Sequence, residues 1–157
     1  MQFTSPSKGS MTLEQVVTDI LAYVGEDPDR PYKLLVGTDS KPFPEGTCFV
    51  RAIIIHRLGK GARYYYNKAF EARMYSLRQR IFYEASLSLE LSDQLYKCLK
   101  EQGREELTVE IHLDVGTHGE TKELVREVTG MIVGSGFGAR IKPDACAAST
   151  VADRYTK

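Results

Sequence analysis

KLLVGTD (33–39) is an apolar run that ends on a carboxylate, Asp39. A second run, LTVEIHLD (107–114), has the same form and ends on Asp114. Short apolar runs bounded by polar residues are typical of buried strands. In α/β sheets, ligand sites form beyond the carboxyl ends of strands, at points where the topology switches. These two segments therefore predict an α/β fold with an acidic site at one edge of its sheet.

Two further acids lie in segments with helical spacing. Glu84 interrupts the buried stripe of a long helix, because at about 100° per residue it points in the same direction as the apolar residues around it. Asp153 lies in the last such segment, ASTVADRYTK (148–157). An apolar core accepts an ionised carboxylate only when another group pairs with or coordinates it. The four acids together therefore predict a shared divalent-metal site.

The order of elements predicts the topology. Residues 1–10 are polar and are expected to be a flexible lead-in, followed by an additional N-terminal helix over 11–25 that Thr12 and Gln15 cap. A Pro/Gly loop is expected over 41–47, and Ser76 is expected to cap the longest helix. The spacing predicts strands over 33–39, 48–58, 62–69, 107–114 and 139–143, and helices over 76–102, 119–134 and 148–157. This β-β-β-α-β-α-β-α order indicates a mixed five-stranded sheet in a single domain over 1–157.

Composition narrows the class of protein. The 157 residues are 42% hydrophobic and 27% charged, as expected of a globular domain. The sequence has neither a membrane-length apolar run nor the apolar core of a signal peptide. Its three cysteines are odd in number and widely spaced, which argues against a disulfide framework or a zinc ribbon. We expect a cytoplasmic protein that does not enter a membrane.

The charge distribution is uneven although the net charge is zero. The segment 51–80 contains eight lysines and arginines and one acid, Glu71. Acidic residues dominate the segment that follows, 84–127. A basic part beside an acidic part suits a protein that binds phosphates with one and metal with the other. Solvated strand and helix faces are the alternative explanation.

Each acid also has a structural explanation. Asp39 can start an Asx-turn into the loop that follows its strand. Glu84 can form a core ion pair with Arg80 or Arg51. Asp114 can cap a turn or the helix after it, and Asp153 can pair with Thr150 at a helix start. The metal site is favoured because it accounts for all four acids at once.

Magnesium and manganese suit this arrangement of acids. Mg²⁺ takes oxygen ligands from one or two carboxylates and completes its shell with water and substrate phosphate. Two such ions about 4 Å apart activate a water and stabilise the leaving oxygen of a phosphodiester. The pattern predicts two Mg²⁺ or Mn²⁺ ions and phosphodiester hydrolysis.

Five long phrases carry a family resemblance. They are KLLVGTDS, IIIHRLGKGARYYY, SLRQRIFYEASLSLEL, EIHLDVGTHGETKELVREVTGM and GFGARIKPDACAASTVADRYTK. In these phrases the sequence resembles the bacterial YkuK-like, ribonuclease H-like family, and the likeness extends over nearly the whole chain. The resemblance implies the ribonuclease H fold and a relation to metal-dependent nucleases.

The resemblance also implies roles for individual residues. Asp39 matches the first-strand aspartate, Glu84 the helix glutamate, Asp114 the fourth-strand aspartate and Asp153 the last-helix aspartate of ribonucleases H. Those enzymes have a histidine before the last helix that assists product release. This chain departs there, since PDACAAS (143–149) contains none. His118 is the candidate replacement.

The remaining candidates are contacts to substrate. Ser40 follows Asp39 in a GTDS context, where small residues allow a ligand to approach closely. Four cations are candidate phosphate contacts, with ordinary surface charge as the alternative: Lys60, Arg63, Arg78 and Lys142. The tyrosines of 64–66 alternate along a strand and are candidates for base stacking, with one or two expected to face the core.

We therefore expect a metal-dependent nuclease acting on RNA, an RNA–DNA hybrid or structured DNA. The alternative is a non-catalytic nucleic-acid- or protein-binding module on the same fold.

Overall fold

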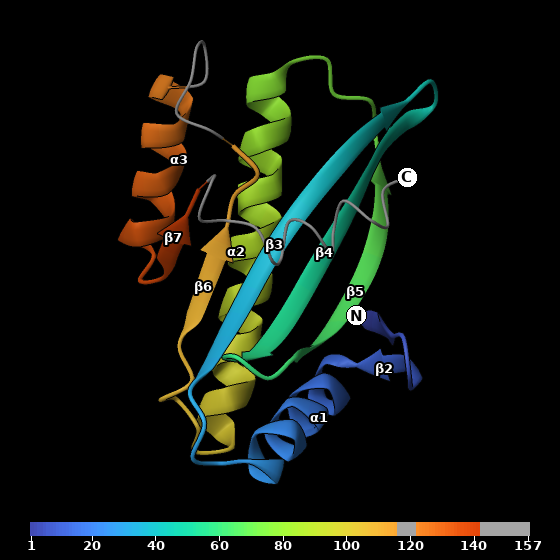
Figure 1. Ribbon diagram of the computed structural model, residues 1–157. Coiled ribbons are helices and arrows are strands. Elements are labelled where there is room, and N and C mark those ends of the chain that lie inside the picture. Colours follow the sequence, from blue (N-terminus) through green and yellow to red (C-terminus); the bar gives the residue numbers. More distant parts are fainter. Residues whose placement is uncertain (116–121, 142–157) are drawn as a thin grey trace.

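The computed structural model describes residues 1–115 and 122–141 (Figure 1). Its strands are β1 (Gln2–Ser5), β2 (Gly9–Thr12), β3 (Tyr32–Phe43), β4 (Gly46–Arg57), β5 (Ala62–Glu71), β6 (Val109–His112) and β7 (Gly138–Arg140). Its helices are α1 (Leu13–Glu26), α2 (Leu77–Glu101) and α3 (Lys122–Gly134). The predicted final helix, with Asp153, lies outside the described residues, as do His118 and Lys142.

All the described strands form one mixed sheet in the order β2-β1-β5-β4-β3-β6-β7. The strands β3, β4 and β5 form an antiparallel meander, whereas β6 and β7 continue the sheet parallel to β3. The helix α2 connects β5 to β6, and α3 connects β6 to β7. Such helical crossovers are the usual connection between parallel strands. The predicted α/β fold with a mixed sheet is confirmed.

The predicted number of five strands is wrong, because the described residues form seven strands in the sheet. The additional pair, β1 and β2, is a hairpin that covers most of the predicted flexible lead-in (1–10) and the first two residues of the helix predicted over 11–25. Gly9 takes a φ of 73° after the turn of this hairpin, a conformation that glycine adopts without strain. Phe3 and Met11 are register partners and are both buried in the core. Burial of these two side chains holds the segment in place.

The helix caps predicted from the sequence are confirmed. Thr12 and Gln15 form a capping box at the start of α1, with the Gln15 amide donating to Thr12 Oγ1 at 3.2 Å. Ser76 caps α2, where its Oγ accepts from the Gln79 amide at 3.0 Å. Gly103, just beyond α2, has a φ of 69°. These local bonds satisfy groups that a helix end leaves without intrahelical partners.

The loop predicted over 41–47 is shorter than expected. Strand β3 continues to Phe43, and β4 begins at Gly46, so the two form one long hairpin. Pro42 lies beyond residues 34–37, the part of β3 that pairs with β6, and a strand edge tolerates proline. The hairpin therefore extends well past the end of β6, as Figure 1 shows.

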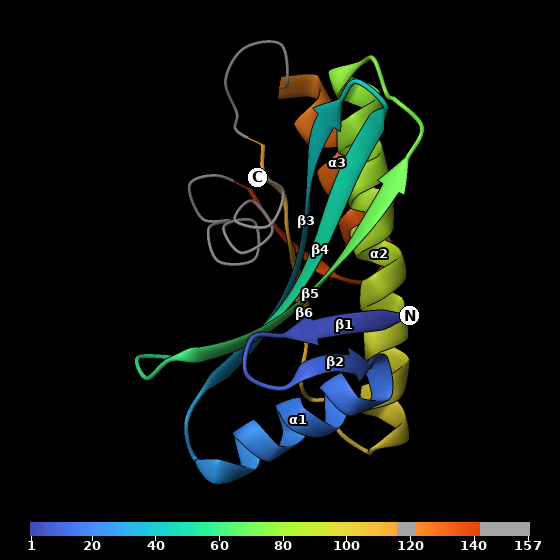
Figure 2. The same ribbon diagram turned by 90° about the vertical axis from the view of Figure 1, so that its right-hand side faces the viewer.

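The three helices of the described residues cover the same face of the sheet (Figure 2). Leu34 and Val36 of β3 pack in one core cluster with residues of α1 and α2. Ile111 of β6 packs in a second cluster with α3 and the first half of α2. Within residues 1–115 and 122–141, no helix is long and apolar enough to cross a membrane.

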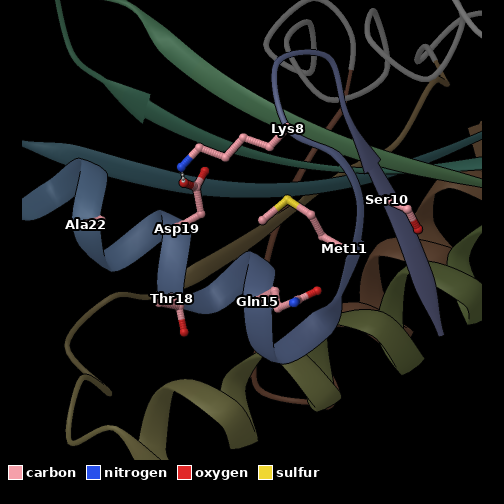
Figure 3. A pocket seen from close by; sticks show the side chains of 7 residues that line it. All are labelled: Lys8, Ser10, Met11, Gln15, Thr18, Asp19 and Ala22. Atoms are coloured by element: carbon pink, nitrogen blue, oxygen red, sulfur yellow. Dashed lines mark hydrogen bonds and ion pairs between the residues drawn. The ribbon is translucent and has the colours of Figure 1, made fainter.

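A buried carboxylate joins the N-terminal hairpin to the rest of the molecule. Asp19 of α1 is 5% exposed and forms ion pairs with Lys8, in the β1–β2 turn, and with Arg63 of β5 (Figure 3). The Tyr65 hydroxyl also donates to it. Burial alone would raise the pKa of Asp19, but the hydrogen bonds from Lys8 and Tyr65 and the charges of Lys8 and Arg63 outweigh it and lower that pKa. The carboxylate therefore stays ionised and links three elements.

We predict that Asp19→Asn lowers the free energy of unfolding by about 1–3 kcal/mol at neutral pH, because buried donors lose a charged acceptor. Urea unfolding measures this loss. Since folding lowers the pKa of Asp19, its contribution is present above the ordinary value of 3.8 and is lost as the pH falls through the lower folded value.

The matched control is Asp93→Asn, which removes an exposed pair between Asp93 and Lys97 on α2. Exposed helix pairs contribute about 0.3–0.5 kcal/mol. Equal losses in the two variants would contradict the anchoring role of Asp19.

Candidate functional site

Strand β3 presents different side chains to its two faces at the point where Asp39 lies. Thr38 Oγ1 is 2.8 Å from Ser88 Oγ of α2, and the Ser40 hydroxyl donates to Glu84 of the same helix. Since side chains alternate along a strand, Asp39 projects from the face opposite α2. Asp39 is 9% exposed.

Strand β6 brings Asp114 to the same place. The parallel register ends with the pair Gly37 and His112, and Asp39 and Asp114 each follow two residues later on these neighbouring strands. The Leu113 amide donates to the Arg140 carbonyl at 2.9 Å, which keeps the chain within the sheet beyond His112. Neighbouring strands lie about 4.8 Å apart. The two aspartates therefore lie at the carboxyl ends of neighbouring strands, where the charges of both act on Glu84.

Glu84 supplies the third acid from α2. It lies on the face of the helix that carries the buried Ile81 and Ser88, as its spacing predicted. Burial is the main cause that raises the pKa of Glu84, to about 8. The charges of Asp39 and Asp114 also raise this pKa, whereas the Ser40 hydrogen bond and Arg80 lower it. The structure thus brings three of the four predicted acids into one electrostatic environment.

The predicted alternative for Glu84, a core ion pair with an arginine, is not what the described part of the chain forms. Glu84 accepts a hydrogen bond from Ser40 there and makes no ion pair with Arg80 or Arg51. Arg51 instead donates to Asn67 Oδ1 at 2.9 Å on β5. The acids therefore outnumber the cations around Glu84.

The described side chains fit a divalent cation in charge but do not form a complete cage. Among residues 1–115 and 122–141, no three histidine, cysteine or carboxylate side chains are grouped closely enough to hold a metal ion. Mg²⁺ does not require such a cage, since one or two carboxylates suffice when water and phosphate complete its shell. Repulsion by the charges of Asp39 and Asp114 adds to burial in raising the proton affinity of Glu84. A bound cation would relieve that repulsion.

The structure does not bring all the predicted substrate contacts to this site. Arg63 pairs with Asp19 and Glu26, and Lys60 is exposed in the β4–β5 turn. The register places Arg63 level with Leu34, which is about 16 Å along β3 from Asp39. These two cations therefore lie at the opposite end of the sheet.

Two other predicted contacts take part in pairs within the protein. Arg78 forms an exposed ion pair with Glu127 at 2.7 Å, which joins the start of α2 to α3. Tyr65, at the centre of the predicted stacking tyrosines, is fully buried and donates to Asp19. Ser40, by contrast, contacts Glu84 and belongs to the site.

Two features near the acids were not predicted from the sequence. The Thr38–Ser88 bond fixes α2 against β3 beside Asp39. His112 is 5% exposed, and neither of its ring nitrogens has a hydrogen-bond partner within the described residues. Burial lowers the pKa of His112. Its position two residues before Asp114, on the same strand face, was the signal available in the sequence.

Comparison with known proteins agrees with this geometry. A sequence profile described as ribonuclease H-like matches residues 15–157. The chain belongs to the ribonuclease H-like family. It is 36% identical over 168 residues to "Uncharacterized protein YkuK" of Bacillus subtilis (strain 168), with 99% of this chain and 96% of that protein covered. No solved structure gives a significant match. The family resemblance seen in the sequence is confirmed.

We predict that Glu84→Gln removes a pH-dependent loss of stability in a buffer with a metal chelator. The folded protein holds the Glu84 proton up to about pH 8, whereas the unfolded chain releases it near its ordinary value of 4.5. Between these values the folded state binds more protons, so stability falls as the pH rises. The variant lacks this fall, which we expect to be on the order of 2 kcal/mol. Urea unfolding across the pH range measures it.

Glu90→Gln is the matched control, since Glu90 is exposed on the same helix. It should keep the pH profile of the unmodified protein. A Glu84→Gln profile that also matches the unmodified protein would contradict the raised pKa of Glu84.

Proposed function

We propose that this protein is a divalent-metal-dependent nuclease that hydrolyses phosphodiester bonds. The observation that carries the proposal is the electrostatic contact of Glu84 of α2 with Asp39 of β3 and Asp114, just beyond β6. Burial, the largest cause, and these two charges raise the pKa of Glu84 to about 8. Perturbed acids at the edge of a sheet are typical of functional sites. Membership of the ribonuclease H-like family suggests nuclease-type activity and supports the same conclusion.

In this proposal Asp39 and Asp114 hold Mg²⁺ or Mn²⁺, with Glu84 and Asp153 as further ligands. When bound, a pair of such ions supplies activation of a water and stabilisation of charge on the leaving oxygen. Ser40 orients the Glu84 carboxylate through its hydrogen bond. The Thr38–Ser88 bond holds α2 and β3 together, so that acids from two elements keep a fixed separation.

The proposed substrates are RNA, an RNA–DNA hybrid or structured DNA. Cations near the acids would contact phosphates and set the register of the strand. Arg63 and Arg57 are less available for this role, because α1 engages both through Glu26. Lys41 and Lys68 are nearer to Asp39, because Lys41 is two residues along β3 and the register aligns Lys68 with Asp39 across β4.

We predict that Asp39→Asn reduces Mg²⁺- or Mn²⁺-dependent cleavage by at least about 100-fold while leaving the fold intact, because the amide cannot supply the anionic oxygens that a hard cation prefers. The measurement is the rate of cleavage of labelled RNA, hybrid and branched DNA, with circular dichroism as the test of folding. Asp93→Asn is the matched control and should cleave at the unmodified rate. Full activity of Asp39→Asn would overturn the proposal.

A non-catalytic binding module is the second candidate. One observation favours it: the described acids are not grouped into a coordination cage. The two candidates differ in their response to metal, because only a metal-binding protein gains stability from Mn²⁺ in proportion to occupancy.

We predict that Mn²⁺ at about 100 times its dissociation constant stabilises the protein by about 2.7 kcal/mol. Thermal unfolding with increasing Mn²⁺ measures the gain, and Asp39→Asn should lose most of it. A melting temperature that does not respond to Mn²⁺ or Mg²⁺ would favour the binding module.

A further inference from the structure

The sheet face that carries Asp39 becomes positive and aromatic toward the β3–β4 turn. Lys41 and Phe43 follow Asp39 at alternate positions of β3, so all three project from the same face. Across β4, the register aligns Asp39 with Lys68 and Lys41 with Phe70. Residues that are opposite one another in a sheet share a face. The four residues Lys41, Phe43, Lys68 and Phe70 are called the aromatic–basic patch below.

The patch is open to solvent. Phe70 is 71% exposed, and both lysines are exposed. Lys41 Nζ lies 5.7 Å from the centre of the Phe43 ring. Phe43 and Phe70 line a hollow of about 490 Å³ together with Glu45, Gly46 and Glu71. The Phe70 ring is therefore not packed in the core, and its exposed face lies beside two lysines.

The acid next to Phe70 is directed away from the patch. Glu71 follows Phe70 in β5, so its side chain projects from the opposite face, where α2 lies. Burial and a hydrogen bond with Glu71 raise the pKa of the Tyr83 hydroxyl of α2. The same helix face places the Tyr83 ring against Phe49, with centroids 4.8 Å apart. The charge of Glu71 is therefore engaged on the helical side. On the patch side, Lys41 and Lys68 outnumber the one acid of the turn that lines the hollow, Glu45.

We infer that the aromatic–basic patch binds single-stranded nucleic acid, with an unpaired base stacked on Phe70 and phosphates on Lys41 and Lys68. This inference rests on the proposed function, because the nucleic-acid strand that the patch binds is the substrate whose phosphodiester bond reaches Asp39. Within the patch, Phe70 lies two residues, or about 7 Å, along the strand direction from Asp39. It also lies two strands, or about 10 Å, across the sheet from that residue. A ring face is available only to a base that is not paired within a helix. The preferred substrate is therefore single-stranded, or has an unpaired segment beside the cleaved bond.

The test is binding without cleavage. Fluorescence anisotropy measures the affinity for a labelled single strand of about 12 nucleotides, a length within the usual site sizes of small domains, in a buffer with a metal chelator. We expect Phe70→Ala to weaken binding by about 10- to 100-fold, and Phe70→Trp to keep it, because indole also stacks. Tyr96→Ala is the matched aromatic control on α2, where Tyr96 is 36% exposed. It should bind as the unmodified protein does.

The lysines have their own measurement. Each phosphate contact contributes about 0.7 to the slope of the logarithm of affinity against the logarithm of salt concentration for single strands. Lys41→Ala and Lys68→Ala should each reduce the slope by about that amount. Lys60→Ala is the matched control, because Lys60 is an exposed lysine at the other end of the same strands.

The outcomes separate this inference from the nuclease proposal. Unmodified affinity in Phe70→Ala, or an equal loss for blunt duplex and single strand, overturns the patch even if Asp39→Asn abolishes cleavage. Loss of single-strand binding in Phe70→Ala, together with no cleavage by any variant, supports the patch and overturns the nuclease. Failure of the unmodified protein to bind any single strand also overturns the patch.

Discussion

The alternation of side chains along β3 determines how the rest of the molecule is arranged. This strand pairs with β4 on one side and β6 on the other, so its backbone is fixed across residues 34–37 by two ladders. One set of its side chains, from Leu34 to Ser40, contacts the helices. The other set includes Asp39. A central strand with two ladders is the most rigid support that a sheet can give to a charged side chain.

Like charges then set the chemistry at the end of this strand. Three carboxylates from separate elements lie close enough for two of them to raise the proton affinity of the third. Folding tolerates such an arrangement because the helices and ladders around it supply the stabilisation. Functional sites in proteins are commonly supported in this way, at a local cost in stability. The excess of negative charge is therefore the feature of this region that indicates a functional site.

Local signals predicted much of this fold. The polar residues at 12 and 76 indicated helix starts, and alternate or helical spacing indicated the strands that hold Asp39 and Asp114 and the stripe that holds Glu84. The N-terminal hairpin was not predicted, because each strand has four residues and the segment is rich in turn formers. The hairpin is held to the core by Phe3 and by an ion pair between Lys8 and Asp19 of the helix that follows it. Neither contact is indicated by hydrophobic periodicity or turn residues.

The features of the candidate site could also be predicted from the sequence only in part. The convergence of three acids followed from topology, since adjacent parallel strands end at one edge. The ion pairs of Arg63 could not be predicted from topology, because its partners Asp19 and Glu26 come from α1, which is distant from Arg63 in the sequence. The alignment of Lys68 with Asp39 depends on the register of two hairpins, which in turn depends on the lengths of their turns.

The two-sided character of β3 limits how its length can change during evolution. Inserting or deleting a single residue before Asp39 would exchange its two faces, turning the acid toward the apolar interior and a hydroxyl outward. Two residues added or removed together would preserve the faces and shift only the distance to α2. Among homologues, length variation in this strand should therefore occur in even steps or be compensated by a bulge.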